Sequence, residues 1–448
     1  MMSLLLFPII LLLFLSIFLL TLSLRQIMRD RRLSFSTLLV VSFSFVYPIS
    51  GLIHIVFKDN FYRGYFDAVN GVVIGSALRS NLNVTLIVYI AALSLLAGIK
   101  LYKKPNTQLK SNHKVRTSYS SAIYFGLFLF FLGLFSTYTL YQNLGIYEIN
   151  RLIIFNISDG MGRYVFFSYW LAWGVSLIYL RKLYTAPIKS DLISSILLIS
   201  CALIITLNLT WTGGRSIAVL LTLPLIYVSL LKHPSYLRFS APIYIIGALV
   251  YIAWLSIVRA DSFYYNDVSI TNLIDWHFGR YSMVAHAVDY TSRSGFLLGQ
   301  TFFSALASLI QSPLNFLGID TPFLGDSSAV SIIGYDLTGV RSTVHIVPGI
   351  LAETFLNFGI LGVAPTFFAI GYFCRAIDYR IKSEINSSLY GSIFYAYLGC
   401  SLSITLLNGT IQALLSGVFY AGLPLLFFFA VRKFLEKNIM LARFRIKF

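Results

Sequence analysis

Long apolar segments recur along the whole chain, and they restrict its possible folds more than any other feature. Because an α-helix rises 1.5 Å per residue, about 20 apolar residues are enough to cross the hydrocarbon layer of a bilayer. Only 11% of the 448 residues are charged and 57% are apolar, a balance typical of a polytopic helical membrane protein. Eleven segments are predicted to be membrane helices: 3–24, 33–57, 83–99, 118–142, 164–180, 192–210, 216–231, 240–258, 346–373, 388–407 and 411–431.

The loops between these segments alternate in charge. Six of them hold 24 of the 34 lysines and arginines. Cytoplasmic loops of membrane proteins carry such an excess of cations, so we expect these six, and with them the C-terminus, on the cytoplasmic side. The net charge of +17 then follows from membrane orientation and does not indicate a nucleic-acid partner. The six loops are 25–32, 100–117, 181–191, 232–239, 374–386 and 432–448.

The opposite side of the membrane retains ten cations, and nine of them are arginine. The guanidinium group binds phosphate or carboxylate through two parallel hydrogen bonds, which is a reason to keep arginine where topology does not require a cation. One loop on this side is long, from Arg259 to His345, and loops of such length are usually functional. Within it, the apolar stretch 296–317 favours a helix lying on the membrane surface or dipping into it. The ten are Lys58, Arg63, Arg79, Arg151, Arg163, Arg215, Arg259, Arg280, Arg293 and Arg341.

Several classes of chemistry lack their usual sequence signals. The three cysteines, Cys201, Cys374 and Cys400, have no paired spacing, which disfavours a disulfide framework or a metal site. Walker, HExxH and GxSxG motifs are absent, and no pair of aspartates has clear metal-binding spacing. Because the positive charges of the N-terminal region follow its apolar run, that run is expected to be the first membrane helix and not a cleaved signal. We therefore predict no metal and no cofactor.

An anion site is predicted where the sixth helix ends and the seventh begins. Gly213 and Gly214 allow a ligand to approach the backbone closely, and Arg215 immediately precedes the predicted start of the next helix at Ser216. Free N–H groups and the positive end of the helix dipole point the same way as Arg215. A tight turn with an arginine that extends its charge into the membrane interface is the alternative interpretation.

A second group lies in the long loop, in a segment (274–291) that is predicted to be helical. Trp276 and Arg280 are four residues apart, so the indole could stack on the guanidinium, and His277 is three residues from Arg280. Aromatic rings beside charged groups suit the binding of sugars or lipid phosphates. An interfacial aromatic belt explains the tryptophan equally well.

A third group begins at Arg341 and leads through His345 into the membrane helix that contains Glu353. A carboxylate inside an apolar span is a functional-site candidate by default, and its alternative role is that of a buried partner for an arginine such as Arg215. His345 could act as a general base near neutral pH, or only as an interfacial hydrogen-bonding group. Eight residues, or roughly 12 Å along a helix, separate His345 from Glu353, so they cannot bond directly.

These elements together resemble the O-antigen polymerase family (Wzy type) and the related O-antigen ligases. The stretch 212–216 resembles the family's TGSR element, Gly279-Arg280 resembles its second loop arginine, and 342–362 resembles the polar loop that runs into a helix with an N/E-x-G-x-x-G element. The resemblance covers roughly residues 205–375. Gly214 stands where the family often has serine, and Ile346 follows His345 where ligases typically have asparagine. The second difference favours the polymerases.

The resemblance implies a single polytopic domain (1–448) of the bacterial inner membrane, with eleven helices (ten to twelve) and a periplasmic loop (259–345) that contains short helices. It also implies a metal- and nucleotide-independent glycosyltransferase that joins undecaprenyl-diphosphate-linked oligosaccharides, beside a flippase and a chain-length regulator of the same pathway. A ligase acting on lipid A-core and a flippase for the lipid-linked repeat are the alternatives. The predicted catalytic residues are Arg215, Arg280, His345 and Glu353, and the predicted substrate-binding residues are Gly213, Gly214, Arg341, Arg259, Trp276 and His277.

Overall fold

The described part of the chain is entirely helical apart from turns and short connections, which confirms the predicted all-α class. Five of its helices are long and apolar enough to cross a membrane, namely Leu6–Asp30, Phe35–Val56, Leu82–Leu101, Ala122–Asn143 and Gly349–Glu384, and three shorter apolar helices accompany them. We therefore describe an all-α membrane protein. The computed structural model describes residues 2–30, 33–56, 81–103, 119–144, 161–185, 191–211, 215–233, 247, 279–316, 327–338, 347–405, 407 and 409–428.

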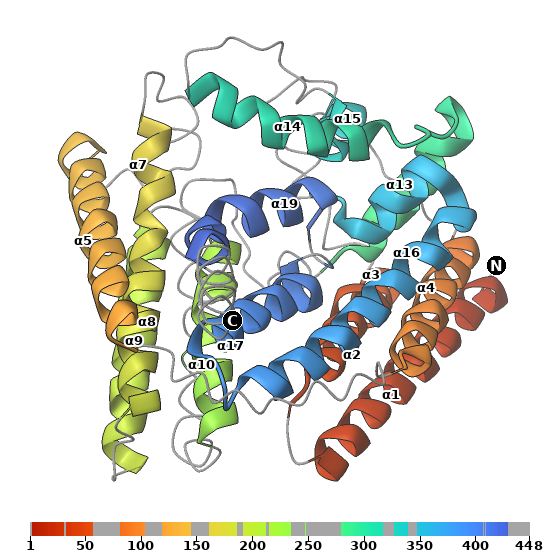
Figure 1. The fold of residues 1–448 in the computed structure, drawn as a ribbon. Helices are drawn as coiled ribbons and strands as arrows, with labels where there is room; N and C mark the ends of the chain where they lie inside the picture. Colours follow the sequence, from red (N-terminus) through yellow and green to blue (C-terminus); the bar gives the residue numbers. More distant parts are fainter. Residues whose placement is uncertain are drawn as a thin grey trace, which may run out of the picture. The chain divides into compact units, whose positions relative to one another are not determined.

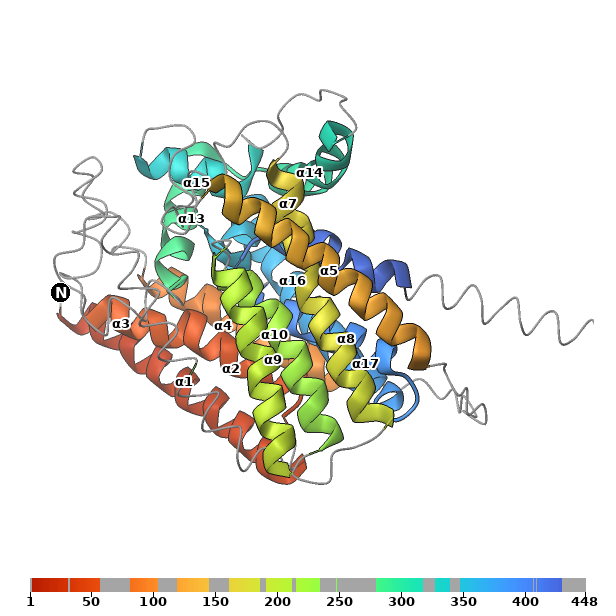
Figure 2. The same cartoon turned by 90° about the vertical axis from the view of Figure 1, so that its left-hand side faces the viewer.

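The chain forms two compact units, each built from separate stretches of sequence. The first combines residues 1–104, 246–378 and 401–416. Within it, α1, α2, α4 and the long α16 run side by side, while α13, α14 and α15 lie at the end where α16 begins (Figure 1, Figure 2). Its helices are α1 (Met2–Asp30), α2 (Phe35–Ser44), the π-helical turn η1 (Phe45–Ile49), α3 (Ser50–Val56), α4 (Asn81–Leu101), α13 (Tyr281–Ser294), α14 (Gln300–Phe316), α15 (Ala329–Thr338), α16 (Gly349–Glu384), η6 (Ser401–Thr405) and α19 (Ile411–Ser416).

Close approach of two helices in the first unit depends on glycine. A Cβ atom at Gly371 of α16 would overlap the carbonyl oxygen of Leu95, and one at Gly98 of α4 would overlap that of Phe368. Because small residues let membrane helices bring their backbones together, this pair of glycines fixes α4 against α16.

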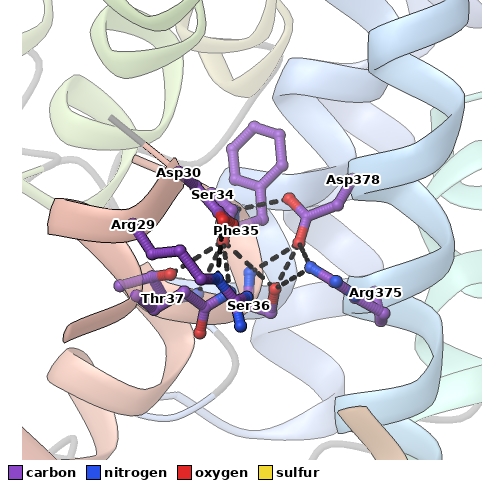
Figure 3. A network of polar contacts seen from close by, with 9 residues as sticks. Arg29, Asp30, Ser34, Phe35, Ser36, Thr37, Arg375 and Asp378 are labelled. Carbon is purple, nitrogen blue, oxygen red and sulfur yellow. Dashed lines mark hydrogen bonds and ion pairs between the residues drawn. The ribbon is translucent and has the colours of Figure 1, made fainter. Parts of the chain in front are cut away.

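A buried carboxylate ties the start of α2 to the far part of α16. Asp378 accepts hydrogen bonds from the backbone N–H groups of Phe35 (2.7 Å) and Ser36 (3.1 Å), and also from the Ser36 hydroxyl. The Arg375 guanidinium lies 3.7 Å from the same carboxylate (Figure 3). Ser34 caps the helix by accepting from the Thr37 N–H at 3.1 Å. Asp378 thus satisfies N–H groups that the first turn of a helix leaves without partners.

The second unit combines residues 105–245, 379–400 and 417–448. The buried Trp173 of α8 packs edge-on against Tyr397 of α17, with ring centroids 5.0 Å apart, and its indole N–H donates to the carbonyl of Ala421. Gly133 of α5 and Gly174 of α8 allow those two helices to touch, because a Cβ atom at either glycine would overlap the backbone of the opposite helix. The helices are α5 (Tyr119–Leu144), α7 (Met161–Ser168), α8 (Trp170–Thr185), α9 (Asp191–Trp211), α10 (Arg215–Lys232), α17 (Leu389–Cys400) and the π-helical turn η7 (Gly417–Ala421).

Two of the segments predicted to be cation-rich loops are largely helical. The first helix continues through Arg25 and Arg29 to Asp30, and α16 continues through Arg375 and Arg380 to Glu384. The change from apolar to charged residues therefore marks no helix end, because lysine and arginine are good helix formers. Of the remaining predictions, segment 240–258 lies outside the described residues except for residue 247. The predicted loop 259–345 contains α13, α14 and α15 in its described part.

Candidate functional site

The Glu353 carboxylate lies buried near the start of α16 and is held by two donors from distant parts of the chain. Glu353 is only 1% exposed. Its Oε1 accepts from the Thr301 hydroxyl at 3.0 Å, and its Oε2 accepts from the backbone N–H of Ile411 at 2.7 Å. Among the side chains that the structure describes, no lysine or arginine forms an ion pair with it. Hydrogen bonds, rather than a cation, compensate its burial there.

Asn357 completes this cluster one turn further along α16. Its Nδ2 donates to the Thr301 Oγ1 and to the Glu353 carbonyl, both at 2.7 Å, and its Oδ1 accepts from the Thr301 N–H at 3.4 Å. The spacing of four residues puts Glu353 and Asn357 on one helix face. We call Thr301, Glu353, Asn357 and the Ile411 N–H the Glu353 cluster. It joins α14, α16 and α19 through buried polar groups.

A kink at Gly359 gives α16 a second connection to the loop. Gly359 has φ 59° and ψ −154°, a conformation that side chains other than glycine rarely adopt. Just before this kink, the carbonyls of Leu356 and Asn357 accept from the N–H groups of Leu297 (2.9 Å) and Leu298 (3.0 Å). The glycine therefore has a structural reason, because its φ suits glycine and a Cβ there would lie only 2.9 Å from the Phe296 ring of the segment that enters α14.

Arg280 lies immediately before α13 and packs against the start of α16. Its N–H donates to the Val46 carbonyl at 3.2 Å, and one guanidinium nitrogen donates to the Gly279 carbonyl at 2.9 Å. A Cβ added at Gly349 would lie 3.2 Å from the Arg280 Cγ and 3.2 Å from the Tyr47 hydroxyl. Since Glu353 follows Gly349 by four residues, about 6 Å along the helix axis, Arg280 and Glu353 belong to the same end of α16.

Tyr47 is a buried member of this site that sequence reasoning did not identify. Its hydroxyl donates to the Leu407 carbonyl at 3.0 Å and accepts from the Leu351 N–H at 3.2 Å. It therefore fixes the first turn of α16 against the π-helical turn η1. The sequence signal was a tyrosine followed by Pro48 inside an otherwise apolar span, a combination that occurs at many positions without function.

In the described part of the segment 274–291, which was predicted to be helical, α13 begins only at Tyr281. Arg280 has φ −121° and ψ −1° and precedes the first helical residue, Tyr281. The backbone N–H of Arg280 is bonded to Val46 of η1 and not to a residue of its own helix, so this contact with another element fixes the position of Arg280. The helical spacing that we used to bring Arg280 close to Trp276 and His277 therefore does not apply at Arg280. Trp276 and His277 themselves lie outside the described residues.

The structure describes two of the four predicted catalytic side chains. Arg280 and Glu353 both belong to the first unit, where Arg280 lies against Gly349, four residues before Glu353 on α16. Arg215 is the first residue of α10 in the second unit, one residue before the predicted helix start, and nothing is described of its side chain. His345 lies outside the described residues, as do the predicted binding residues Gly213, Gly214, Arg259 and Arg341.

Arg293, which had no role in the sequence analysis, joins α13 to α15. Its guanidinium contacts Asp336 at 2.9 Å and Asp289 at 3.2 Å. Beside these groups, burial lowers the pKa of His286 to about 4, while the nearby Asp336 and Asp289 carboxylates act in the opposite direction. His286 is therefore neutral at physiological pH. The spacing 286, 289 and 293 would have predicted a shared helix face, but Asp336 could not have been paired from sequence.

Comparison with known proteins assigns no function to this site. No family model, curated protein or solved structure matches the chain. Among the described residues, no group of three or more His, Cys, Asp or Glu side chains is placed to hold a metal ion. The chemistry open to the described site is hydrogen bonding and charge stabilisation by Arg280, near the end of α16 that also carries the buried Glu353 carboxylate, each of whose oxygens accepts one hydrogen bond.

Proposed function

We propose that the chain is a glycosyltransferase of the bacterial inner membrane that polymerises undecaprenyl-diphosphate-linked oligosaccharide repeats into O-antigen or a similar surface polysaccharide. The observation that carries the proposal is the close approach of Arg280 to Gly349 at the start of α16. Two motif segments about 70 residues apart in sequence, one with an arginine and one with an intramembrane carboxylate, thereby meet in one unit. Proximity of these two segments is expected if both bind the same substrate.

The charge pattern supports a periplasmic site in a chain of eleven membrane helices. With the 24 clustered cations in the cytoplasm, Arg280 and the start of α16 belong to the opposite side. Nucleoside triphosphates and nucleotide sugars are not supplied there. Substrates must then arrive already activated on a lipid carrier, which is consistent with the absence of nucleotide-binding motifs.

The proposed reaction needs one bond made and one bond broken. A hydroxyl oxygen of the non-reducing sugar of a new lipid-linked repeat attacks the anomeric carbon of the growing chain. A glycosidic C–O bond forms, the bond from that carbon to the diphosphate oxygen breaks, and undecaprenyl diphosphate leaves with the bonding electrons. Arg280 binds the diphosphate as its charge grows, and Arg215 and Arg341 are proposed for the same role from the sequence motifs alone. His345, joined to Gly349 through three residues, takes the proton of the attacking hydroxyl.

Glu353 has a different role in this proposal, that of a positioning residue. Both of its oxygens are occupied by Thr301 and Ile411, and the residue is buried. A general base has to reach the proton that it removes. The Glu353 cluster instead holds α14 and α19 against the end of α16 that carries Gly349 and, beside it, Arg280.

The ligase remains the second candidate because it shares the donor and the arginine elements. Ile346, which stands where ligases typically have asparagine, favours the polymerase. A flippase is less well supported, since the ionisable residues gather at the outer ends of the predicted helices rather than along a path at the membrane midplane. The proposed partners are the lipid-linked oligosaccharides, the bilayer, and a flippase and a chain-length regulator of the same pathway.

Deletion of the gene in its native host separates these functions on a lipopolysaccharide gel. Loss of a polymerase should leave core carrying one repeat, because ligation of single repeats continues. Core without any repeat would contradict the proposal and indicate a ligase or a flippase. Lipid-linked repeats would then accumulate on the periplasmic face if a ligase is missing, and on the cytoplasmic face if a flippase is missing. Complementation with the intact gene should restore the long ladder.

A further inference from the structure

The helix α14 in the long loop has one buried polar face and one exposed apolar face. Thr301 (1% exposed), Ser304 (5%) and the small Ala305 (0%) face the interior of the unit, where α14 packs on α19. On the other face, Phe303, Leu306 and Ile310 are 72%, 52% and 64% exposed. No charged residue occurs anywhere between positions 296 and 317. A loop helix in water would be expected to carry charge on its exposed face.

This apolar face continues onto a membrane-spanning helix. A Cβ at Gly299 would lie 3.2 Å from the Phe358 ring and 3.6 Å from the Phe303 ring, and Phe358 packs edge-on against Phe302 of α14 with ring centroids 5.5 Å apart. Beyond Phe358, the residues Ile360 and Leu361 of α16 are 48% and 88% exposed, within the candidate membrane span Gly349–Glu384. The exposed stripe of α14 therefore begins next to the exposed apolar residues of that span.

The entry into α14 also leaves few backbone donors without protein partners. The N–H groups of Leu297 and Leu298 donate to carbonyls of α16, and that of Thr301 donates to Asn357 Oδ1. In hydrocarbon, unlike in water, each backbone polar group has to be satisfied within the protein, and non-helical backbone is tolerated only under this condition. The N–H groups of Gln300, Phe302 and Phe303 likewise donate to the carbonyls of Leu297 and Gly299.

We propose that α14 is embedded in the bilayer as a re-entrant helix, with Phe303, Leu306 and Ile310 in contact with lipid acyl chains. Its first turn is bonded to Glu353 and Asn357, which follow the start of α16 by four and eight residues. These positions correspond to about 6 and 12 Å along the helix axis. The polar cluster thus holds α14 at hydrocarbon depth, in the leaflet on the side where α16 begins. The inference rests on the membrane character of the chain and not on the proposed enzymatic activity.

Spin-label accessibility in vesicles tests this placement. Leu306→Cys and Ile310→Cys are made in a Cys201→Ser background, since Cys374 and Cys400 are buried, and each variant is labelled with a nitroxide. The protein is reconstituted into vesicles of phosphatidylethanolamine and phosphatidylglycerol. Collision with oxygen, which concentrates in hydrocarbon, is compared with collision with a water-soluble nickel chelate. Leu361→Cys on α16 is the lipid-facing reference, and Ser294→Cys at the charged end of α13 is the water-facing reference.

Both α14 labels should favour oxygen over nickel to the same degree as the label at Leu361. A ratio like that of Ser294 would place the stripe in water and overturn the proposal. Protection from both reagents would overturn it as well, because a second copy of the chain or another protein would then cover the stripe. Since Leu306 and Ile310 are exposed, neither substitution removes a packing contact in the core, and elution of the labelled proteins as single species checks their folding.

Discussion

Replacing Arg280 by lysine is expected to shorten the polysaccharide from a long ladder to core with a single repeat. Lysine keeps the charge but loses the planar fork that binds two oxygens of a diphosphate at once. Removal of one well-placed donor to a developing negative charge reduces turnover roughly 100- to 1,000-fold. Because Arg280 is fixed by Val46 and lies against Gly349, the shorter donor of lysine cannot be expected to reach the same point. The measurement is a lipopolysaccharide gel of a deletion strain that expresses the variant.

Arg293 supplies the matched control for this exchange. It is also an arginine of the long loop, but its guanidinium is already bonded to Asp289 and Asp336. Arg293→Lys should therefore leave the ladder unchanged, whereas Arg215→Lys should collapse it as Arg280→Lys does. A full ladder from Arg280→Lys, at an expression level equal to that of the unmodified protein, would remove Arg280 from the proposed diphosphate site.

Replacing Glu353 by alanine is expected to destabilise the first unit strongly. The backbone N–H of Ile411 and the Thr301 hydroxyl would both lose their acceptor in a buried position. Each unsatisfied buried group costs about 1–3 kcal/mol, and the truncation also leaves a cavity. A much lower thermal unfolding temperature in detergent, together with loss of elongation, should follow.

The conservative change Glu353→Gln separates positioning from chemistry. A glutamine carbonyl can still accept from the Ile411 N–H, and its amide can donate to Thr301 Oγ1 in place of the bond that Thr301 now donates. The cluster then keeps both connections without a charge, and only the Thr301 hydroxyl hydrogen loses its acceptor. The protein should fold, and its ladder should be close to normal. A stable Glu353→Gln protein that elongates no chains would contradict the positioning role and indicate that the carboxylate itself takes part in the reaction.

Local properties of the chain were sufficient to predict most of its helices. The apolar runs 3–24, 83–99 and 118–142 correspond to α1, α4 and α5, because twenty uncharged residues have few alternatives to a helix in a membrane. The exact ends were less accessible, since α16 continues through its cations to Glu384. Helical periodicity also assigned Arg280 to a helix that begins only at Tyr281.

The partners in the candidate site could not be predicted, because they come from remote parts of the chain. Thr301 precedes Glu353 by 52 residues and Ile411 follows it by 58, and no local pattern relates them. Glu353 was identified from sequence as a carboxylate in an apolar span and was predicted to be catalytic. Its hydrogen bonds to Thr301 and Ile411 instead favour a positioning role. The contact between Arg280 and Gly349 was likewise beyond sequence reasoning, although both residues belong to motifs that the sequence singled out.

Elongation by the purified protein is the most direct test of the proposed polymerase. The full chain in detergent is mixed with undecaprenyl-diphosphate-linked repeats, without nucleotide sugars and with a metal chelator, and the lipid-linked products are separated by size. We predict products of two and more repeats together with free undecaprenyl diphosphate, and no such products from Arg280→Lys. A folded protein that forms no product longer than one repeat, or that transfers repeats only when lipid A-core is added, would contradict polymerisation as its function.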